Sequence, residues 1–161
     1  MPLRITIVAL GVFLGATPVY GQEAPYEQDF IVTAYYSPLP GQCCYVTGGL
    51  RADRVVNGGG VRAADSTEVY PGMAAAPKSY PFGTRIRMPG VGVVEVHDRG
   101  GAIVELPGGT HRIDIWVGRG EEGLARALAF GVQRLRGTVY PVGSLQPSVS
   151  LDLEQLPSPW E

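Results

Sequence analysis

Two aspartates stand at positions where a carboxyl group could take part in acid chemistry. Asp98 ends a strand-like run and is followed by Gly100-Gly101, a glycine pair that leaves backbone amides open to a ligand. Asp114 follows sixteen residues later, between two isoleucines in an apolar strand-like run where aspartate is unusual. Strand alternation puts Asp114 and Trp116 on one face, away from both isoleucines.

This spacing points to acid catalysis if the strands 92–98 and 112–117 lie close together. The two carboxyl groups would then meet beside an aromatic platform, and desolvation and like charge would raise the pKa of one of them. Such a protonated carboxyl can act as a general acid on a glycosidic oxygen. The spacing also allows a structural interpretation, in which Asp114 faces solvent and Asp98 caps an ordinary turn.

The elements that would position these aspartates are short strands. Glutamates in a first turn and a following Gly131 predict one helix from Glu121 to Phe130. Runs rich in β-branched and aromatic residues predict strands at 30–36, 84–88, 92–97, 112–117 and 132–142, and shorter ones at 61–64 and 73–76. Six or seven short strands with one helix predict a mainly β fold, a small barrel.

The composition fits one compact domain. The chain has 161 residues, 17% of them charged, and a formal net charge of −2. This balance excludes a strongly basic nucleic-acid binder and an acidic disordered protein. Residues 30–142 nevertheless hold 12 basic and 9 acidic side chains between acidic flanks. A mildly basic domain suits an anionic polymer as partner and requires no nucleic acid.

The chain divides into four predicted segments. Residues 1–21 have the layout of a secretory signal peptide, with a positive start, an apolar stretch from Ile5 to Thr17 and small residues before Gln22. Residues 22–29 are predicted to be a flexible lead, 30–142 the domain and 143–161 a disordered tail. We expect a monomer that is secreted or held in the periplasm or cell envelope, with no membrane span in the mature chain; an uncleaved anchor is the alternative.

The two cysteines of the chain, Cys43 and Cys44, are adjacent. Adjacent cysteines close only a strained ring, so the alternatives are free thiols or pairing between chains. His97 and His111 stand at no spacing typical of a cysteine nucleophile or of a metal site. We therefore expect neither thiol catalysis nor a bound metal.

Several stretches, in the right order, resemble one known family and together cover nearly all of residues 30–142. The runs Asp98–Ile103 and Arg112–Trp116 resemble the signature of the three-aspartate (3D) domain. The same pattern closes the catalytic barrel of membrane-bound lytic transglycosylase A. Further matches are Val32–Ser37 with the opening strand, Pro81–Ile86 with a central Pro-Leu-Gly-Thr stretch, and Gly120–Glu122 with Phe130-Gly131 after the last aspartate.

The resemblance implies a fold and an activity. The fold would be a six-stranded double-psi β-barrel with, here, one short helix. The activity would be cleavage of peptidoglycan glycan strands between N-acetylmuramic acid (MurNAc) and N-acetylglucosamine (GlcNAc) without water. In that reaction an aspartate protonates the glycosidic oxygen, and the muramyl 6-hydroxyl closes a 1,6-anhydro ring. By motif position Asp114 matches the acid and Asp98 its supporting carboxylate, and no cofactor is implied.

Two departures from the family pattern bear on this activity. Ala76 stands where the family has its first aspartate, and Asp53 or Asp65 would have to approach from another loop to replace it. The interval from Asp98 to Asp114 is also longer than in the family, which could change the glycan that fits.

Seven further residues are predicted to contact substrate: Tyr35, Lys78, Thr84, Arg99, Gly100, Gly101 and Trp116. The aromatic members could stack on sugar rings, although aromatic side chains in short strands more often belong to a core. The basic ones could meet peptide-stem carboxylates, although exposed basic side chains are usually only solvated. His97 is predicted to be a structural partner, because strand alternation turns it away from Asp98.

Three functions follow as hypotheses. The first is a glycan-cleaving enzyme of the lytic transglycosylase type, favoured by Asp98 and Asp114. The second is a non-catalytic module that binds or loosens cell walls, in the manner of expansin-like barrels, favoured by Ala76. The third is an inhibitor or adhesion domain that uses the loops.

Overall fold

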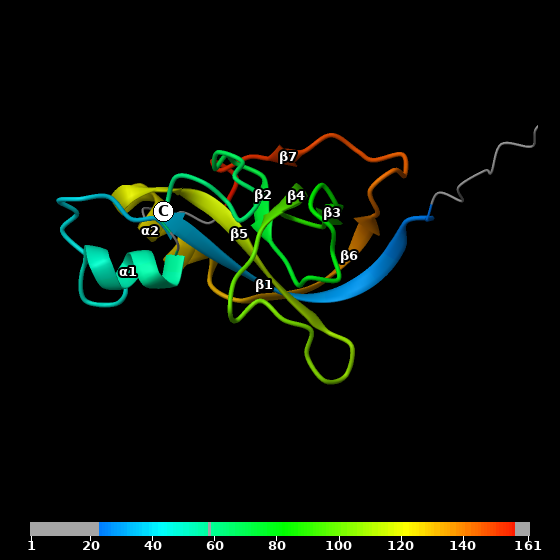
Figure 1. Ribbon diagram of the computed structural model, residues 1–161, viewed down its shortest axis with the longest axis horizontal. Helices are drawn as coiled ribbons and strands as arrows, with labels where there is room; N and C mark the ends of the chain where they lie inside the picture. The colour runs from blue at the N-terminus through cyan, green and yellow to red at the C-terminus, as the bar shows by residue number, and fades with distance from the viewer. Residues whose placement is uncertain (1–22, 58, 157–161) are drawn as a thin grey trace, which may run out of the picture.

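The computed structural model describes residues 23–57 and 59–156. These residues form seven strands and two helices (Figure 1). In chain order the elements are β1 (Tyr26–Ser37), α1 (Leu50–Asn57), β2 (Met73–Ala75), β3 (Arg85–Met88), β4 (Gly92–Asp98), β5 (His111–Arg119), α2 (Gly120–Phe130), β6 (Gln133–Tyr140) and β7 (Ser150–Leu151).

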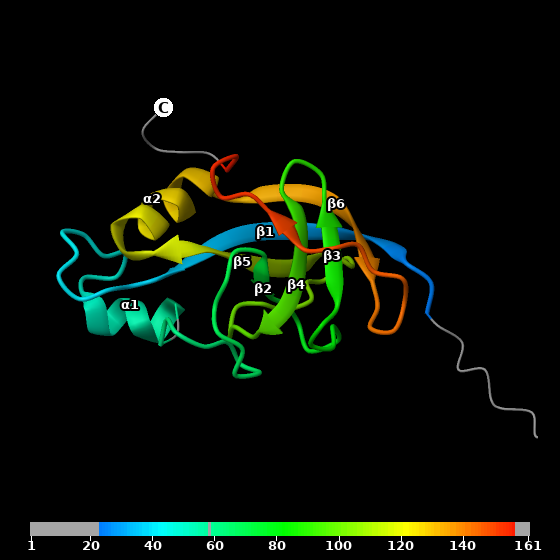
Figure 2. The ribbon, with the colours of Figure 1, turned by 90° about the horizontal axis from the view of Figure 1, so that it is seen from above.

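Six of the strands close into a barrel. The order is β2-β5-β1-β6-β3-β4, and a β2–β4 pairing closes the ring. The pairs β1–β5 and β2–β4 are parallel, and the other pairs of the ring are antiparallel. The seventh strand, β7, lies antiparallel on the first half of β4 (Figure 2). The predicted mainly β fold with a six-stranded barrel is therefore confirmed.

Alternation along the strands fills the barrel with apolar side chains. Ile113 and Ile115 of β5 are fully buried, and they pack with Val32 of β1 and Val94 and Val96 of β4. Because side chains alternate, the residues between them point outward. The prediction that Asp114 faces away from its two isoleucines is confirmed, since the isoleucines belong to the interior cluster and Asp114 does not.

The predicted flexible lead and disordered tail are each wrong in part. Residues 26–29 begin β1, because they pair with residues 136–139 of β6. In the tail, β7 pairs with Gly92 and Val93, and Leu156 is buried against the interior cluster. Leu156 thus packs in the interior cluster, and Leu151 and Leu153 are partly buried against it. The predicted signal peptide lies outside the described residues.

Of the two helices in the described residues, one was predicted from the sequence. The predicted helix at 121–130 is α2, which packs against β1 and β5. Helix α1 was not predicted; glycines stand on both sides of it, and its buried residue is the polar Asp53. The predicted strand at 61–64 is reduced to a single bridge between Arg62 and Glu68. No helix within the described ranges combines the length and the apolar character that crossing a membrane requires.

Candidate functional site

The strand register brings Asp98 and Asp114 to the two sides of one residue. Strand β2 lies between β4 and β5, and its Ala75 is opposite Asp98 on one side and Asp114 on the other. Two strand spacings put the two aspartate Cα atoms about 10 Å apart. Both aspartates line the same cavity, so the predicted meeting of two carboxyl groups is supported by the register.

A β-bulge decides where Asp98 points. The register steps from Ala74 opposite Val96 directly to Ala75 opposite Asp98, so His97 is left unpaired. As a result, both His97 and Asp98 contact the loop that precedes β2. The prediction that these two side chains point to opposite faces is wrong, because strand alternation holds only without a bulge.

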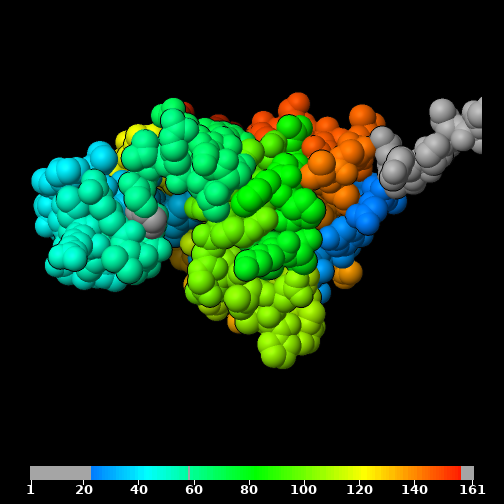
Figure 3. Space-filling model, viewed as in Figure 1, coloured from blue at the N-terminus to red at the C-terminus, as the bar shows by residue number. Residues whose placement is uncertain are grey.

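The cavity lies on the outer side of the β1–β5–β2 wall. Its volume is about 110 Å³. Helix α1 and the following residues form one side of it, and the segment after β4 forms the other; Figure 3 shows the surface hollowed between them. The lining residues are Tyr35, Ser37, Val56, Asn57, Gly60, Arg62, Val69, Ala75, Asp98, Arg99, Gly100, Ile103 and Asp114.

Three donors hold the Asp98 carboxylate. The Tyr35 hydroxyl donates to Oδ2 at 3.0 Å, and the backbone N–H groups of Ala64 and Arg99 donate to Oδ1 at 3.0 and 2.8 Å. Burial, and then the neighbouring Asp98 charge, raise the pKa of Tyr35, which therefore stays a proton donor. Asp98 is thus fixed in orientation as a hydrogen-bond acceptor.

Asp114 is held differently. Its Oδ1 is buried and has no hydrogen-bond partner among the described residues. Burial is the largest influence and raises the pKa of Asp114 to about 6; Thr33 lowers it in part, and of the two smaller effects the charge of Asp98 raises it and that of Arg112 lowers it. A carboxyl with this pKa can hold a proton in mildly acidic solution and release it to a substrate.

The structure divides the predicted substrate residues. Tyr35, Arg99 and Gly100 line the cavity. Lys78 and Gly101 line an adjoining hollow of about 410 Å³, which shares Arg99, Gly100 and Ile103 with the cavity. The two hollows thus meet at the segment that follows β4.

Thr84 and Trp116 do not line this surface, and both are buried, so the structure does not support their prediction as substrate contacts. Thr84, the last residue of the β2–β3 connection, is buried and lines a separate hollow. Trp116 is only 5% exposed, and its Nε1 donates to Ser37 Oγ at 2.9 Å. The loop that precedes β2 covers the Trp116 ring with Ala63 and Val69. A buried indole cannot stack on a sugar.

The guanidinium of Arg99 is occupied by the protein itself. It donates to the carbonyl oxygens of Ala76 and Tyr80 at 3.2 and 2.7 Å, and it lies over the Phe82 ring, 4.1 Å from its centroid. Arg99 therefore fastens the β2–β3 connection to β4. What it presents to the cavity is mainly its backbone and stem.

Among the described residues, the cavity lining holds two carboxylates and no third. Ala76 is fully buried and lines the adjoining hollow. Asp65 lies close to β4 but bonds His97 at 2.6 Å. Asp53, a residue of α1, is fully buried. Neither aspartate replaces the missing one.

Sequence reasoning missed the residues of the cavity that come from the excursion between β1 and β2: Ser37, Val56, Asn57, Gly60, Arg62 and Val69. They reach the site because α1 is anchored by Asp53. The Asp53 carboxylate accepts hydrogen bonds from the Tyr36 hydroxyl, from the backbone of Val46 and from both Thr47 donors. The one sequence signal for this anchor was Asp53 itself, the single acidic residue of a segment with glycines on both sides.

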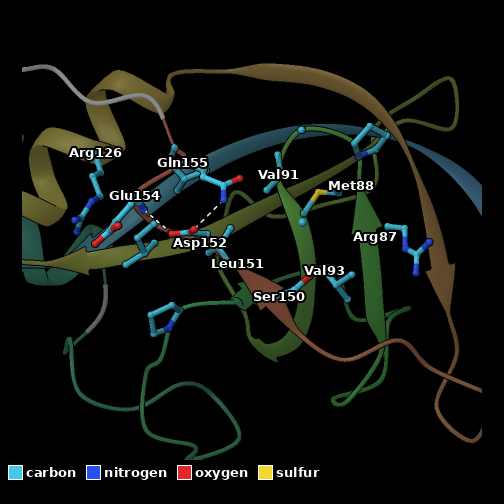
Figure 4. A pocket seen from close by; sticks show the side chains of 16 residues that line it. Arg87, Met88, Val91, Val93, Arg126, Ser150, Leu151, Asp152, Glu154 and Gln155 are labelled. Carbon is cyan, nitrogen blue, oxygen red and sulfur yellow. Dashed lines mark hydrogen bonds between the residues drawn. The ribbon is translucent and has the colours of Figure 1, made fainter. Parts of the chain in front are cut away.

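A larger hollow among the described residues lies elsewhere and has different chemistry. It measures about 1020 Å³ and lies between the β3–β4 turn and the segment 150–156 (Figure 4). Its Asp152 accepts hydrogen bonds from the backbone of Glu154 and the side chain of Gln155. This carboxylate closes its own turn, so the smaller cavity is the candidate site.

The cysteines are exposed and free, with their sulfur atoms 3.1 Å apart. The hydrogen bond with Cys44, with smaller effects of burial and Glu121, raises the pKa of the Cys43 thiol to about 11. The thiolate required for nucleophilic catalysis is therefore disfavoured at neutral pH. Within the described residues, no three His, Cys, Asp or Glu side chains gather as metal ligands would.

In comparisons with known proteins, the chain matches neither a protein-family model nor a curated protein.

Proposed function

We propose that this protein is a peptidoglycan-cleaving enzyme of the lytic transglycosylase type. The observation that carries the proposal is the Asp114 carboxyl, which lines a surface cavity with its Oδ1 buried, has a pKa raised to about 6, and has Asp98 on the other side of Ala75. Two carboxyl groups in different environments are the arrangement used to divide acid and supporting roles in glycoside cleavage. Peptidoglycan is proposed as the glycan because of the resemblance to the 3D domain.

The proposed reaction needs no water. Protonated Asp114 gives its proton to the oxygen that links MurNAc C1 to GlcNAc, and the bond from C1 to that oxygen breaks. Asp98 stabilises the positive charge that develops at C1. The muramyl 6-hydroxyl oxygen then bonds to C1, and its proton passes to the Asp114 carboxylate. The anhydro ring is formed, and Asp114 is protonated again.

The surroundings of the site support a wall polymer as substrate. The hollow that holds Lys78 shares Arg99, Gly100 and Ile103 with the cavity, which suits a chain longer than one sugar along the segment after β4. The domain is mildly basic, whereas peptidoglycan carries carboxylates. This function implies a monomer outside the cytoplasm, secreted or in the cell envelope, that needs no cofactor.

A second function is favoured by one observation, the absence of a third carboxylate among the described residues that line the cavity. If cleavage by this family needs all three aspartates, the protein binds or loosens the wall without cutting it. The cavity and its adjoining hollow would then serve as a glycan-binding groove.

Digestion of purified peptidoglycan separates the two functions. We expect 1,6-anhydromuropeptides by mass spectrometry, and a loss of about a hundredfold or more in Asp114→Asn, because general acids contribute at least that much. Asp98→Asn should also lose product. Asp29→Asn, a change of an exposed aspartate on β1, is the matched control and should keep it. Sedimentation of the protein with wall material and no product under any condition would establish the second function instead.

A further inference from the structure

The densest cluster of titratable side chains outside the cavity surrounds His97. Its Nδ1 lies 2.6 Å from Asp65 Oδ2, and its Nε2 lies 3.0 Å from the Tyr70 hydroxyl and 3.1 Å from Glu95 Oε1. Arg85 completes the cluster, since its Nε donates to Glu95 at 2.7 Å. His97 does not line the cavity, so these contacts have another purpose than touching substrate.

The partner of His97 belongs to a small hairpin, residues 61–69, that rests on β4. Its turn is tied to the strand at two consecutive residues. The Asp65 N–H donates to the His97 carbonyl at 3.2 Å, and the Ala64 N–H donates to Asp98 Oδ1 at 3.0 Å. The hairpin also contributes Arg62 to the cavity. The position of the hairpin therefore decides both a wall of the cavity and the orientation of Asp98.

The hairpin needs an external support. Ser66 follows Asp65 in a left-handed backbone conformation with φ of 75°, which is strained for a residue with a side chain. Asp65 is held on both sides, by Thr67 N–H at 2.9 Å and by His97. Burial alone would raise the pKa of Asp65, but the hydrogen bonds from His97 and Thr67 lower it, so the carboxylate is ionised and its bond to His97 is charge-assisted when the imidazole is protonated.

We propose that His97 is a positioning residue, which holds Asp65 and thereby seats the 61–69 hairpin so that the Ala64 N–H fixes Asp98. The effect of this seating on cleavage rests on the proposed function; the seating itself does not.

The two ring nitrogens have different tasks. Nδ1 donates to Asp65 in both charge states of the imidazole. In the neutral ring Nε2 accepts from the Tyr70 hydroxyl, and in the protonated ring it donates to Glu95. The hydrogen bonds of His97 thus join β4 both to the hairpin, through Asp65, and to Tyr70, the residue that follows the hairpin.

The first test uses the unaltered protein and nuclear magnetic resonance. We expect the amide shifts of Ala64 and Asp65 to change with pH around the same midpoint as the His97 ring. Ala64 and Asp65 amides that do not follow the His97 titration overturn the proposal.

The second test uses His97→Gln and Asp65→Asn, with His111→Gln as the matched control. We expect the pH response of Ala64 to vanish in His97→Gln. Its hydrogen exchange should become about tenfold faster or more in both variants, while amides of β3 stay protected. If His97→Gln also loses protection in β3, Asp65→Asn decides. An unchanged Ala64 amide in a folded variant contradicts the proposal.

Product analysis keeps the two proposals separate. If both hold, product formation from peptidoglycan falls about tenfold or more in His97→Gln and not in His111→Gln. If Ala64 responds as expected and the unaltered protein gives no product, the seating stands and the proposed function fails. If product forms at the same rate in all variants, the function stands and the positioning role fails.

Discussion

Asp114 has the properties of an acid because of the strand that carries it. In strand β5, Ile113 and Ile115 point into the barrel interior, so Asp114 between them points outward, into the site. Its Oδ1 is buried and finds no partner among the described residues. Asp98, one strand beyond Ala75, is satisfied by three donors. One carboxyl is therefore prepared to hold a proton and the other to stay an acceptor.

This difference predicts the pH dependence of activity. Asp114 must be protonated to act as the acid, and its pKa is raised to about 6. Product formation should be greatest below that pH and should decline as the pH rises through about 6. Initial rates on peptidoglycan between pH 4 and 8 test this. A rate that increases through the same range would assign the acid role to another group.

The same carboxyl predicts a gain of stability on substitution. Because the pKa of Asp114 is higher in the folded chain than the ordinary value near 4, its favourable contribution is complete below pH 4 and is lost as the pH rises through about 6. Asp114→Asn should therefore be more stable than the unaltered protein at pH 8, by up to roughly 3 kcal/mol, and nearly equal at pH 4. Urea unfolding at both pH values measures this, and equal stability at pH 8 would contradict it.

At the scale of the elements, the site depends on two pieces that interrupt regular structure. The bulge in β4 turns Asp98 toward the 61–69 hairpin. Helix α1, which lies to one side of the barrel in Figures 1 and 2, brings Val56 and Asn57 to the cavity. The helix has little apolar surface of its own to bury, and its anchor is the carboxylate of Asp53.

Replacement of this anchor should loosen α1 and leave the barrel intact. Asp53→Ala removes the acceptor of four donors and should cost about 2–4 kcal/mol in the stability of the α1 region. Although burial opposes it, these hydrogen bonds lower the pKa of Asp53 to about 2. Its contribution is therefore present above pH 4 and disappears as the pH falls toward 2.

Hydrogen exchange at pH 7 measures this local effect. We expect amides of Leu50–Asn57 to lose protection, while amides of β3 keep theirs. Asp29→Ala, on the exposed side of β1, is the control and should change neither. Equal loss of protection in β3 would mean that α1 and the barrel unfold as one unit.

At the scale of the whole molecule, the closed barrel provides two parallel strand pairs that bring distant segments together. The alternation of apolar residues was enough to predict the six strands of the barrel and the outward direction of Asp114, although not β7. It could not predict the bulge at His97, because a register shift depends on the partner strand. Nor could it predict that Trp116 is covered, since the loop residues Ala63 and Val69 that cover it carry no local pattern.

The chain also shows that a composition of serines, prolines and acids does not establish disorder. Residues 143–161 were predicted from composition to be a disordered tail, yet within its described part Leu156 is 5% exposed and packs on the barrel, whereas Leu145 is 92% exposed. A leucine that packs against apolar surface of the barrel can order a polar segment, whereas a leucine exposed to solvent does not.

This contrast predicts a matched pair of substitutions. Leu156→Ala should lower the free energy of unfolding by about 2–4 kcal/mol, because it leaves a cavity in the interior cluster. Leu145→Ala should change it by less than about 0.5 kcal/mol. Thermal or urea unfolding of the two variants checks this, and equal values would mean that the segment does not belong to the folded domain.

Cleavage without water is the central claim, and one measurement tests it most directly. Peptidoglycan is digested in water enriched in the heavy oxygen isotope, and the new muramyl ends are weighed by mass spectrometry. The proposed reaction predicts 1,6-anhydro ends that carry no heavy oxygen, with the yield lost in Asp114→Asn. Reducing ends that carry the heavy oxygen would show that water attacks C1, and would contradict the proposed mechanism.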